Sequence, residues 1–472
     1  MCDWPWARYS VFMSDLAIPA QSQATSAAPV VPSSVQAWYV VAVLSLAGIV
    51  SYIDRQVINL LVEPIKADLG VSDVQISLLQ GFSFALFYAV LAIPLAWISD
   101  RHNRKMVILL GLVCWSAATF ASGLAGVFAV LFVARMFIGV GEATLSPAGF
   151  SIISDYFSKE KLPGPISVFT GSGFVGSGIA LILGGYLYAT LAEMGTTALP
   201  FGTFEPWQLT FMCVALLSVP LFFLMLTIRE PERRDGAKAA VQEEGAPALE
   251  IFDFVGSHKG VFLPLFLGFS CLAGAQYGLG AWAPSYFIRV HEWTQLDVGQ
   301  MFGPVLMVAG PLGVISGGFA AERMLARGVD DATLRLPMLA VIAALPFAIA
   351  FPLVVSPMLA LGLLGLVTFL GTIPFGAGVA TFPLVTPNRM RAQVMALYLL
   401  IANLLSYSLG PTLIALITDH VFGDEKAINL SLAIAVPLVM AAGAILILLA
   451  IRPYREMVRA QSNGETPDHG SD

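Results

Sequence analysis

Twelve long apolar segments follow one another along the chain, separated by short stretches that contain charged residues, prolines or turn residues. A helix needs about 20 mostly apolar residues to cross the hydrocarbon core of a bilayer, and each segment is long enough to do so. The pattern therefore predicts twelve transmembrane helices, at 38–62, 75–99, 106–126, 127–154, 164–190, 207–228, 260–289, 298–320, 336–355, 358–383, 391–418 and 427–451.

The longest polar interruption, at 229–259, divides these helices into two sets of six. The fold class expected is an all-α membrane protein with two six-helix bundles related by a pseudo-two-fold axis. The predicted parts are a disordered cytoplasmic tail at 1–37, an N-terminal bundle at 38–228, a cytoplasmic linker at 229–259, a C-terminal bundle at 260–451 and a cytoplasmic tail at 452–472.

A short motif recurs in equivalent loops of the two halves. Asp100-Arg101 follows the second helix of the first half, and Glu322-Arg323 follows the second helix of the second half. Parallel repeats of six helices, joined by a long linker, are the plan of transporters whose binding site lies between the two halves.

The composition excludes a soluble fold. Of the 472 residues, 57% are hydrophobic and 12% are charged, about half the charged share of ordinary globular domains. The four cysteines lie at 2, 114, 213 and 271, with no spacing typical of a metal site or a disulfide, so we expect reduced thiols that pack. No metal or other cofactor and no nucleic-acid partner is predicted.

Most cations lie on one side of the predicted bilayer. Of the 24 Lys and Arg residues, 19 fall in the tails and in the loops that follow even-numbered helices. Three lie on the opposite side (Lys66, Arg289 and Lys426), and two lie inside helices (Arg55 and Arg135). The positive-inside rule therefore predicts that both termini are cytoplasmic. We expect no cleavable signal peptide, and Met1 and Met13 both stay open as the start.

Apart from the helix ends, four ionisable acids or bases lie within the apolar spans, all of them in the N-terminal half: Asp54, Arg55, Arg135 and Glu142. A charge near the bilayer centre costs about 2.5–3.5 kcal/mol on insertion scales, so these side chains must face one another or water. Arg135 and Glu142 are seven residues apart and project from one face of a helix, about 10 Å apart.

Two glycines between these residues, Gly139 and Gly141, would allow the first helix to approach and bring Asp54 near Arg135. One interpretation is that two internal ion pairs only fix the packing of helices 1 and 4. The alternative is proton coupling. Since arginine stays protonated, Asp54 and Glu142 are the groups able to exchange a proton, with Arg55 and Arg135 as partners for them or for a substrate head group.

The loop motif suggests a conformational latch. The eleventh helix is predicted to begin near Thr386-Pro387-Asn388 with Thr386 as its N-cap, so its positive dipole end would face Asp100. The charged loop residues of the two halves, Asp100, Arg101, Arg104, Glu322 and Arg323, are the latch candidates. The alternative is that these are only solvated basic loops.

Glycines are dense in the fifth and eighth helices. They permit either close packing or a lateral gate, and packing is the favoured interpretation. The residues are Gly171, Gly173, Gly176, Gly178, Gly184 and Gly185 in the fifth helix, and Gly303, Gly310, Gly313, Gly317 and Gly318 in the eighth.

The C-terminal half has no acid or base in the interior of its spans, so its contribution to a cavity would be neutral. A cavity that is charged on one wall and apolar on the other suits an amphiphile. The predicted lining comprises the polar residues Gln276, Tyr277, Thr372, Asn403 and Ser406, and the aromatic residues Trp282, Phe375 and Phe382.

These motifs resemble the major facilitator superfamily over residues 38–452. The similarity rests on the loop Asp100–Lys105, on the run Arg135–Ala143 and on the glycine-rich fifth helix. Ala96 and Asn103 stand where the loop motif usually has glycines. Four further segments resemble the spinster branch: Tyr52–Arg55, Ser72–Gln75, Trp115–Thr119 and Ile153–Phe157.

The resemblance implies a bacterial relative of spinster transporters, a monomer in the cytoplasmic (inner) membrane that moves lysolipids or sphingoid phosphates with protons. Asp54, Arg55, Arg135 and Glu142 match the functional set of that branch. A multidrug or organic-anion transporter of the same fold is the alternative, and a receptor that binds without flux stays open. A channel lacks a polar lining in the C-terminal half, and a primary pump lacks a nucleotide loop. We expect a transporter and not an enzyme.

Overall fold

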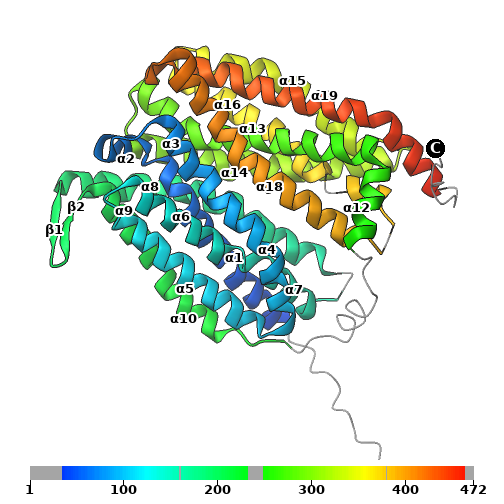
Figure 1. Cartoon of the computed structure of the whole chain (residues 1–472), viewed down its shortest axis with the longest axis horizontal. Coiled ribbons are helices and arrows are strands. Elements are labelled where there is room, and N and C mark those ends of the chain that lie inside the picture. The colour runs from blue at the N-terminus through cyan, green and yellow to red at the C-terminus, as the bar shows by residue number, and fades with distance from the viewer. Residues whose placement is uncertain (1–33, 159–160, 232–247, 379, 388, 463–472) are drawn as a thin grey trace, which may run out of the picture.

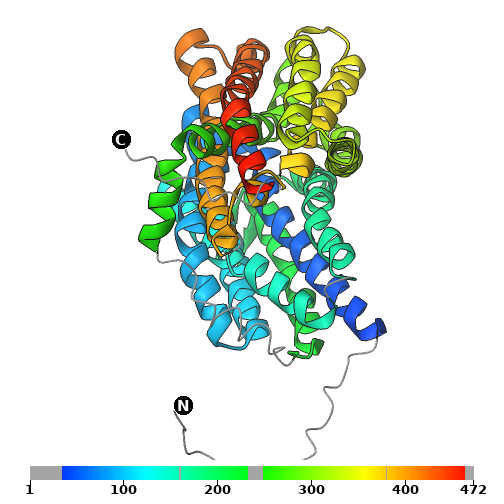
Figure 2. The ribbon, with the colours of Figure 1, turned by 90° about the vertical axis from the view of Figure 1, so that its right-hand side faces the viewer.

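The computed structural model describes residues 34–158, 161–231, 248–378, 380–387 and 389–462. In this part of the chain twelve helical spans are long and apolar enough to cross a membrane, which confirms the predicted fold class. The two halves lie side by side, with their helices running in the same general direction (Figure 1), and each half forms its own group of helices when seen from the end (Figure 2).

The N-terminal half follows the predicted order, with one additional short helix and a hairpin. Its elements are α1 (Ser34–Gln56), η1 (Val57–Asn59), α2 (Val62–Leu69), α3 (Asp73–Ser77), the π-helical η2 (Leu78–Phe82), α4 (Ser83–Arg101), α5 (Arg104–Gly123), α6 (Phe128–Glu142), α7 (Leu145–Tyr156), α8 (Pro163–Met194), β1 (Thr197–Leu199), β2 (Gly202–Phe204), α9 (Pro206–Leu216) and α10 (Ser218–Thr227).

The C-terminal half contains the other six spans, preceded by a short helix, α12 (Ala248–Ser257). Its elements are α13 (Lys259–His291), α14 (Gln295–Leu325), α15 (Ala332–Ala350), η4 (Phe351–Leu353), α16 (Pro357–Gly378), α17 (Thr381–Val385), α18 (Arg391–Leu416), η5 (Ile417–Phe422), η6 (Glu425–Ala427) and α19 (Ile428–Ser462).

Three predicted boundaries differ from the structure. Helix α1 begins at Ser34, inside the predicted tail, and α19 continues to Ser462, inside the predicted C-terminal tail. The predicted linker contains helix α12. The remaining parts of the predicted tails and linker, at 1–33, 232–247 and 463–472, lie outside the described residues.

Local capping explains where two of the helices begin. Ser72 and Gln75 form a reciprocal capping box at the start of α3, and Thr294 and Asp297 form one at the start of α14. Gly70 ends α2 with a φ of 64°, a conformation that a residue with a side chain rarely adopts. These signals turn the chain sharply at the end of the bundles that carries α2, which we call the α2 end.

Glycines bring the two halves together where α8 crosses α14. A Cβ atom on Gly185 would lie 2.5 Å from the carbonyl oxygen of Gln295, and one on Gly299 would lie 2.4 Å from that of Leu181. Gly178 and Gly303 meet in the same way. Most of the glycines predicted for these helices therefore serve close packing, although Gly171 and Gly318 have no neighbour within 4 Å of a Cβ position.

Large apolar side chains cover the outer surface of the bundles. Leu110, Phe223 and Phe319 are each more than 60% exposed, and many other Leu, Ile, Val and Phe side chains are also exposed. Exposure of such an apolar surface to water is unfavourable, whereas lipid chains solvate it. Together with the twelve spans, this surface identifies a multi-pass membrane protein.

Cys114, Cys213 and Cys271 are free thiols on these helices, and each is half-buried. Burial and apolar neighbours make them packing residues. Cys2 lies outside the described residues.

Candidate functional site

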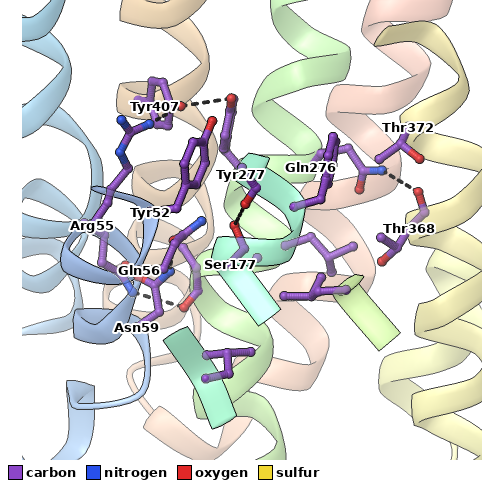
Figure 3. A pocket seen from close by; sticks show the side chains of 18 of the residues that line it. Tyr52, Arg55, Gln56, Asn59, Ser177, Gln276, Tyr277, Thr368, Thr372 and Tyr407 are labelled. Atoms are coloured by element: carbon purple, nitrogen blue, oxygen red, sulfur yellow. Dashed lines mark hydrogen bonds between the residues drawn. The ribbon is translucent and has the colours of Figure 1, made fainter. Parts of the chain in front are cut away.

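A cavity of about 370 Å³ lies between the two halves near the middle of the spans. Arg55, Gln56 and Asn59 lie on one side of it, and Gln276, Thr368 and Thr372 lie on the other (Figure 3). Four residues predicted to line the cavity do so: Gln276, Tyr277, Thr372 and Phe375. The rest of its wall is mainly apolar and includes Phe174, Leu181, Phe302, Leu306 and Val314.

Arg55 is the cation at this cavity, and its charge is paired. Its Nε donates to Oε2 of Glu142 at 3.0 Å, and its Nη2 pairs with the same oxygen. The guanidinium also lies over aromatic rings, 4.1 Å from the centroid of Phe84 and 4.6 Å from that of Tyr52. Glu142 is 2% exposed, and its Oε1 has no hydrogen-bond partner among the described residues. The pair is therefore shielded from water, and Glu142 keeps one unused acceptor.

Asp54 takes no part in this ion pair. It is fully buried, its polar neighbours are the side chains of Thr119 and Trp115, and neither of its carboxyl oxygens makes a hydrogen bond within the described part of the chain. A buried carboxylate without a partner is strongly disfavoured, whereas the protonated form tolerates such a site. The geometry suits a carboxyl group that is neutral in this arrangement.

Arg135 does not form the ion pair with Asp54 that the sequence predicts. Its guanidinium donates to backbone carbonyls, at 3.1 Å to Asp54, 2.9 Å to Arg55 and 3.3 Å to Leu79. Because these carbonyls lie at the end of α1 and in the π-helical η2, Arg135 fixes one segment against the other. Its side chain is fully buried and does not line the cavity.

The glycines next to Arg135 were also assigned to the wrong neighbour. Gly139 packs against the backbone of Phe84 in α4, and Gly141 packs against Gly111 and Trp115 in α5. Neither admits α1. The helix spacing correctly placed both glycines on a contact face, but it could not indicate which helix that face meets.

Two tyrosines of the C-terminal half complete the environment of Arg55. Its Nη1 donates to the hydroxyl of Tyr407 at 2.9 Å, and this hydroxyl donates to that of Tyr277 at 2.9 Å. The two rings are 4.0 Å apart at their centroids. Tyr52 and Tyr407 were missed by the sequence analysis, which singled out charged residues within the spans; Tyr52 lies only three positions before Arg55.

A second cavity of about 160 Å³ lies on the other side of this layer of tyrosines and Arg55. Glu142 and Asn403 line it, and Asn403 is therefore separated from the main cavity for which it was predicted. Tyr52, Arg55, Tyr277 and Tyr407 contribute to both cavities, so they form the partition between them.

Three other predicted lining residues serve packing. Trp282 is buried, and its Nε1 donates to the carbonyl of Pro411 at 2.9 Å. Phe382 stacks among Phe266, Phe269 and Tyr398, and Ser406 donates to the carbonyl of Ser270. None of the three lines either cavity. A helical pattern cannot distinguish a cavity-facing aromatic residue from one that packs between two helices.

Among the predicted latch residues whose side chains the structure describes, none forms an ion pair with the other half. Arg104 is buried and pairs with Asp155 and, at 2.8 Å, with Glu230, so it binds α5 to α7 and to the start of the linker. Arg101 lies over the ring of Trp97, and Glu322 and Arg323 are exposed. The side chain of Asp100 lies outside the described part of the chain.

The eleventh helix begins where the predicted span 391–418 places it, and not near Thr386-Pro387-Asn388. Helix α18 begins at Arg391, with Met390 as its N-cap residue. Thr386 does not cap it; its hydroxyl donates to the carbonyl of Phe382 one turn earlier, in α17. Asn388 lies outside the described residues. A threonine before a proline is a frequent helix start, but here the preceding short helix uses the hydroxyl.

Ion pairs between the halves gather at the α2 end instead, in a group that we call the α2-end cluster: Glu63, Lys66, Asp73, Arg289 and Glu425. Arg289 of α13 reaches Glu63 at 2.7 Å and Asp73 at 2.6 and 2.8 Å. Lys66 pairs with Asp73 and, at 2.7 Å, with Glu425 of the other half. Arg289 and Lys66 are two of the three cations predicted on this side.

The comparisons with known proteins agree with the geometry. The family model described as Major Facilitator Superfamily matches residues 44–411. The chain is 27% identical over 425 residues to an MFS-type efflux pump of Mycolicibacterium smegmatis. The aligned residues cover 89% of this chain and 94% of the relative. It is 26% identical over 408 residues to the sphingosine-1-phosphate transporter SPNS2 of Mus musculus, covering 82% and 70% respectively.

A solved structure is similar over most of its length. It is the inward-facing, unoccupied form of a bacterial homologue of the human lysosomal transporter spinster, with a TM-score of 0.74 and 25% identity. The match covers 93% of this chain and all of that one. This match confirms the predicted resemblance to the spinster branch.

Proposed function

Because the chain belongs to the major facilitator superfamily, a family of membrane transporters, we propose that it moves amphiphilic lipids, lysophospholipid-like or sphingoid-phosphate-like, with protons and by alternating access. The observation that carries this proposal is the Arg55–Glu142 ion pair, which lies at the partition of a cavity lined by both halves. Transport of an anionic head group requires a cation at an interface that the two bundles can open and close.

Two carboxyl groups divide the work of proton coupling. Asp54, buried and without a hydrogen bond, holds a proton in this arrangement, and it releases the proton when a rearrangement admits water. Glu142 pairs with Arg55. Protonation of Glu142 would free the Arg55 guanidinium, which then binds the anionic head group of the substrate.

The lipid part of the proposal rests on the walls of the cavity. Phe174, Leu306 and Phe375 provide an apolar surface beside the polar layer at Arg55, so a head group and a chain each find a matching environment. The similarity to a sphingosine-1-phosphate transporter supports the same substrate class. Arg135 takes no part in head-group binding in this proposal, because its side chain lines neither cavity and its guanidinium donates to three backbone carbonyls.

The protein acts in this proposal as a monomer in a bacterial cytoplasmic membrane, with both termini in the cytoplasm. The excess of Lys and Arg on one side supports this orientation. The α2 end then faces outward, and the ion pairs of the α2-end cluster join the two halves there.

Reconstitution into proteoliposomes under an imposed pH gradient tests the proposal. We expect the gradient to drive accumulation of a lysophospholipid, and Asp54→Asn and Glu142→Gln each to abolish that accumulation. A control, Glu193→Gln, changes an exposed carboxyl outside both cavities and should transport like the wild type. Lysolipid flux that ignores the gradient would contradict proton coupling.

A multidrug or organic-anion transporter of the same fold is the second candidate. The 27% identity with an efflux pump over 89% of the chain favours it. The same proteoliposomes decide between the two, because flux of cationic drugs or of small organic anions, without flux of lysolipids, would replace the lipid proposal.

A further inference from the structure

The six connections between spans at the α2 end are of two kinds. A chain that crosses a bilayer twelve times changes direction at each connection, so every connection that follows an odd-numbered span lies at this end. Three of the six carry the α2-end cluster and further charged residues, at 60–73, 289–297 and 419–426. The other three contain no Lys, Arg, Asp or Glu, and we call them the uncharged rim: 124–127, 195–204 and 354–356.

The uncharged rim exposes large apolar side chains. Val355 is 92% exposed, Phe201 is 61% exposed and Val127 is 56% exposed. The absence of charge extends well beyond the connections themselves, since the chain has no Lys, Arg, Asp or Glu at 106–134 or at 336–388. Exposure of such side chains to water is unfavourable, so the rim is suited to an apolar environment.

The connection at 195–204 contains the hairpin of β1 and β2, which projects beyond α9 (Figure 1). Phe204 of β2 is buried against Leu209 and Met212 of α9, which anchors one face of the hairpin. Phe201 at the turn contacts the ring of Phe204, with 5.2 Å between the centroids, but remains exposed. One aromatic residue therefore holds the hairpin against the bundle, and another lies at its tip.

The base of the hairpin lies at the level of the charged connections. Trp207 Nε1 at the start of α9 donates to Asp68 Oδ2 of α2 at 3.0 Å. Helix α8, which leads into the hairpin, has 32 residues and is about 48 Å long, whereas the hydrocarbon core of a bilayer is about 30 Å thick. The end of α8 therefore reaches the headgroup region, where water and headgroups satisfy the backbone of the turn while lipid chains receive its side chains.

The position of the rim indicates what covers it. Figure 1 shows α5 and the hairpin along one edge of the molecule and α15 along the opposite edge. One partner protein, or a second copy of the chain, would cover one edge, whereas a bilayer surrounds the molecule and meets both. The rim also continues the apolar outer surface of the helices, since Tyr186 and Met194 on α8 are 61% and 63% exposed.

We infer that the uncharged rim inserts into the outer leaflet of the bilayer, with Phe201 and Val355 at the boundary between headgroups and acyl chains, while the charged connections stand in water. The outer edge of each half is then anchored in lipid at the α2 end, beside the central ion pairs that join the halves. Only the name of the leaflet rests on the proposed function, through the orientation of the termini.

Depth measurements on spin labels test this insertion in the full-length protein, reconstituted into phosphatidylcholine nanodiscs. Single labels at Phe201→Cys and Val355→Cys, in a background without native cysteines, are compared for collision with oxygen, which concentrates in lipid, and with a nickel chelate, which stays in water. We expect both labels to lie about 5–10 Å inside the headgroup boundary. The aqueous reference is Ala67→Cys, exposed in a charged connection, and the lipid reference is Leu312→Cys, exposed near the middle of α14.

A charge at the tip should withdraw the hairpin from the bilayer. With the label at Thr203→Cys, an exposed position of β2, Phe201→Asp should lose about 5–10 Å of depth, because a carboxylate is disfavoured in lipid. The matched control, Phe201→Leu, keeps an apolar tip and should leave the depth of this label unchanged. A label at Val355→Cys, on the opposite edge, should report the same depth in both variants, which shows that the protein is folded and inserted.

An aqueous reading at Phe201→Cys or at Val355→Cys, equal to that of Ala67→Cys, overturns the insertion. Exclusion of both collision reagents would place protein over the rim and overturns it as well, as does a depth at Thr203→Cys that Phe201→Asp does not change. Depth at both positions, lost at the hairpin in Phe201→Asp, supports it. The measurement needs no substrate, so an aqueous rim leaves the proposed transport untouched, and a failure of transport leaves the rim.

Discussion

The two ends of the helical bundles use their charges in opposite ways. At the α2 end, Arg289 and Lys66 connect acids of both halves. At the other end, Arg104 pairs with Asp155 inside the N-terminal half, and Arg455 pairs with Asp331 inside the C-terminal half, at 2.5 Å. Within the described residues, no ion pair crosses between the halves at that end.

This difference explains how one chain can be closed at one end and ready to separate at the other. Charge-assisted hydrogen bonds between the halves must break before the α2 end can open, whereas those at the opposite end move with their own bundle. The same reasoning assigns different roles to similar residues. Arg289 contributes to the equilibrium between arrangements, and Arg104 contributes to the stability of one bundle.

Of the variants considered for the two ends, Arg289→Gln should have the largest effect on the equilibrium between closed and open arrangements at the α2 end. It removes one of the two cations that pair with Asp73, which is fully buried, and Lys66 stays as the other. Breaking a buried pair costs about 3–5 kcal/mol when the charge is left without any partner, so we expect a smaller cost here and a rise of roughly 10- to 100-fold in the population open at the α2 end. Spin labels at Ala67→Cys and Val421→Cys, in a background without native cysteines, measure the opening as a longer distance.

Lys426→Gln is the matched control for this experiment. It removes a cation at the same end that forms no ion pair among the described residues, so the distance distribution should stay that of the parent protein. If Arg289→Gln also left the distribution unchanged, the α2-end cluster would not hold the two halves together.

At the opposite end, Arg104→Gln should reduce stability without opening the α2 end. The change removes bonds from Arg104 to Asp155, Glu230 and Ser151, and we expect the free energy of unfolding to fall by about 3 kcal/mol. Thermal unfolding in detergent measures this loss, and Arg101→Gln, an exposed neighbour, should change little. A longer distance between the labels at Ala67→Cys and Val421→Cys would contradict the assignment of Arg104 to one bundle.

Glu63→Gln should have the smallest effect at neutral pH. Burial raises the pKa of the Glu63 carboxyl above its ordinary value of 4.5 in spite of the attraction of Arg289. A carboxyl with a higher pKa in the closed arrangement binds its proton more tightly there, so acidification favours closure through this group. The cost of burying the ionised form is present at neutral pH and is lost as the pH falls.

The variant should therefore close as well as the wild type at neutral pH, or slightly better, and should lose the part of the pH dependence that Glu63 contributes. Distance measurements on the labels at Ala67→Cys and Val421→Cys, made at a series of pH values toward 4.5, check both expectations. Marked opening of Glu63→Gln at neutral pH would show that the Arg289–Glu63 pair stabilises closure after all.

The sequence analysis found the charged residues of the site but not all their partners. Apolar spans make an ionisable residue conspicuous, so Asp54, Arg55, Arg135 and Glu142 could be identified by their position alone. The partners of these residues could not be identified in the same way, because Arg135 binds backbone carbonyls that converge only where η2 meets the end of α1. A hydrophobic pattern contains no signal for that contact.

Three amides that line the main cavity show the same limit. Gln56, Asn59 and Gln80 are polar residues in or next to apolar spans, which is a visible signal, but neutral amides are common at helix ends and their convergence on one cavity depends on the packing of α1 against η2. Trp282 is the reverse case: it was predicted to line the cavity, but it packs between α13 and α18, where its Nε1 donates to the carbonyl of Pro411.

By itself the sequence determined the number of spans, the division into two halves and the concentration of buried charge in the first of them, because a bilayer penalises every polar group in an apolar segment. Only the tertiary structure decided which of those charges pair, where the cavity lies and which end is closed. These properties depend on contacts between residues such as Arg55 and Tyr407, or Arg289 and Asp73, that lie hundreds of positions apart and meet only when the two bundles pack together.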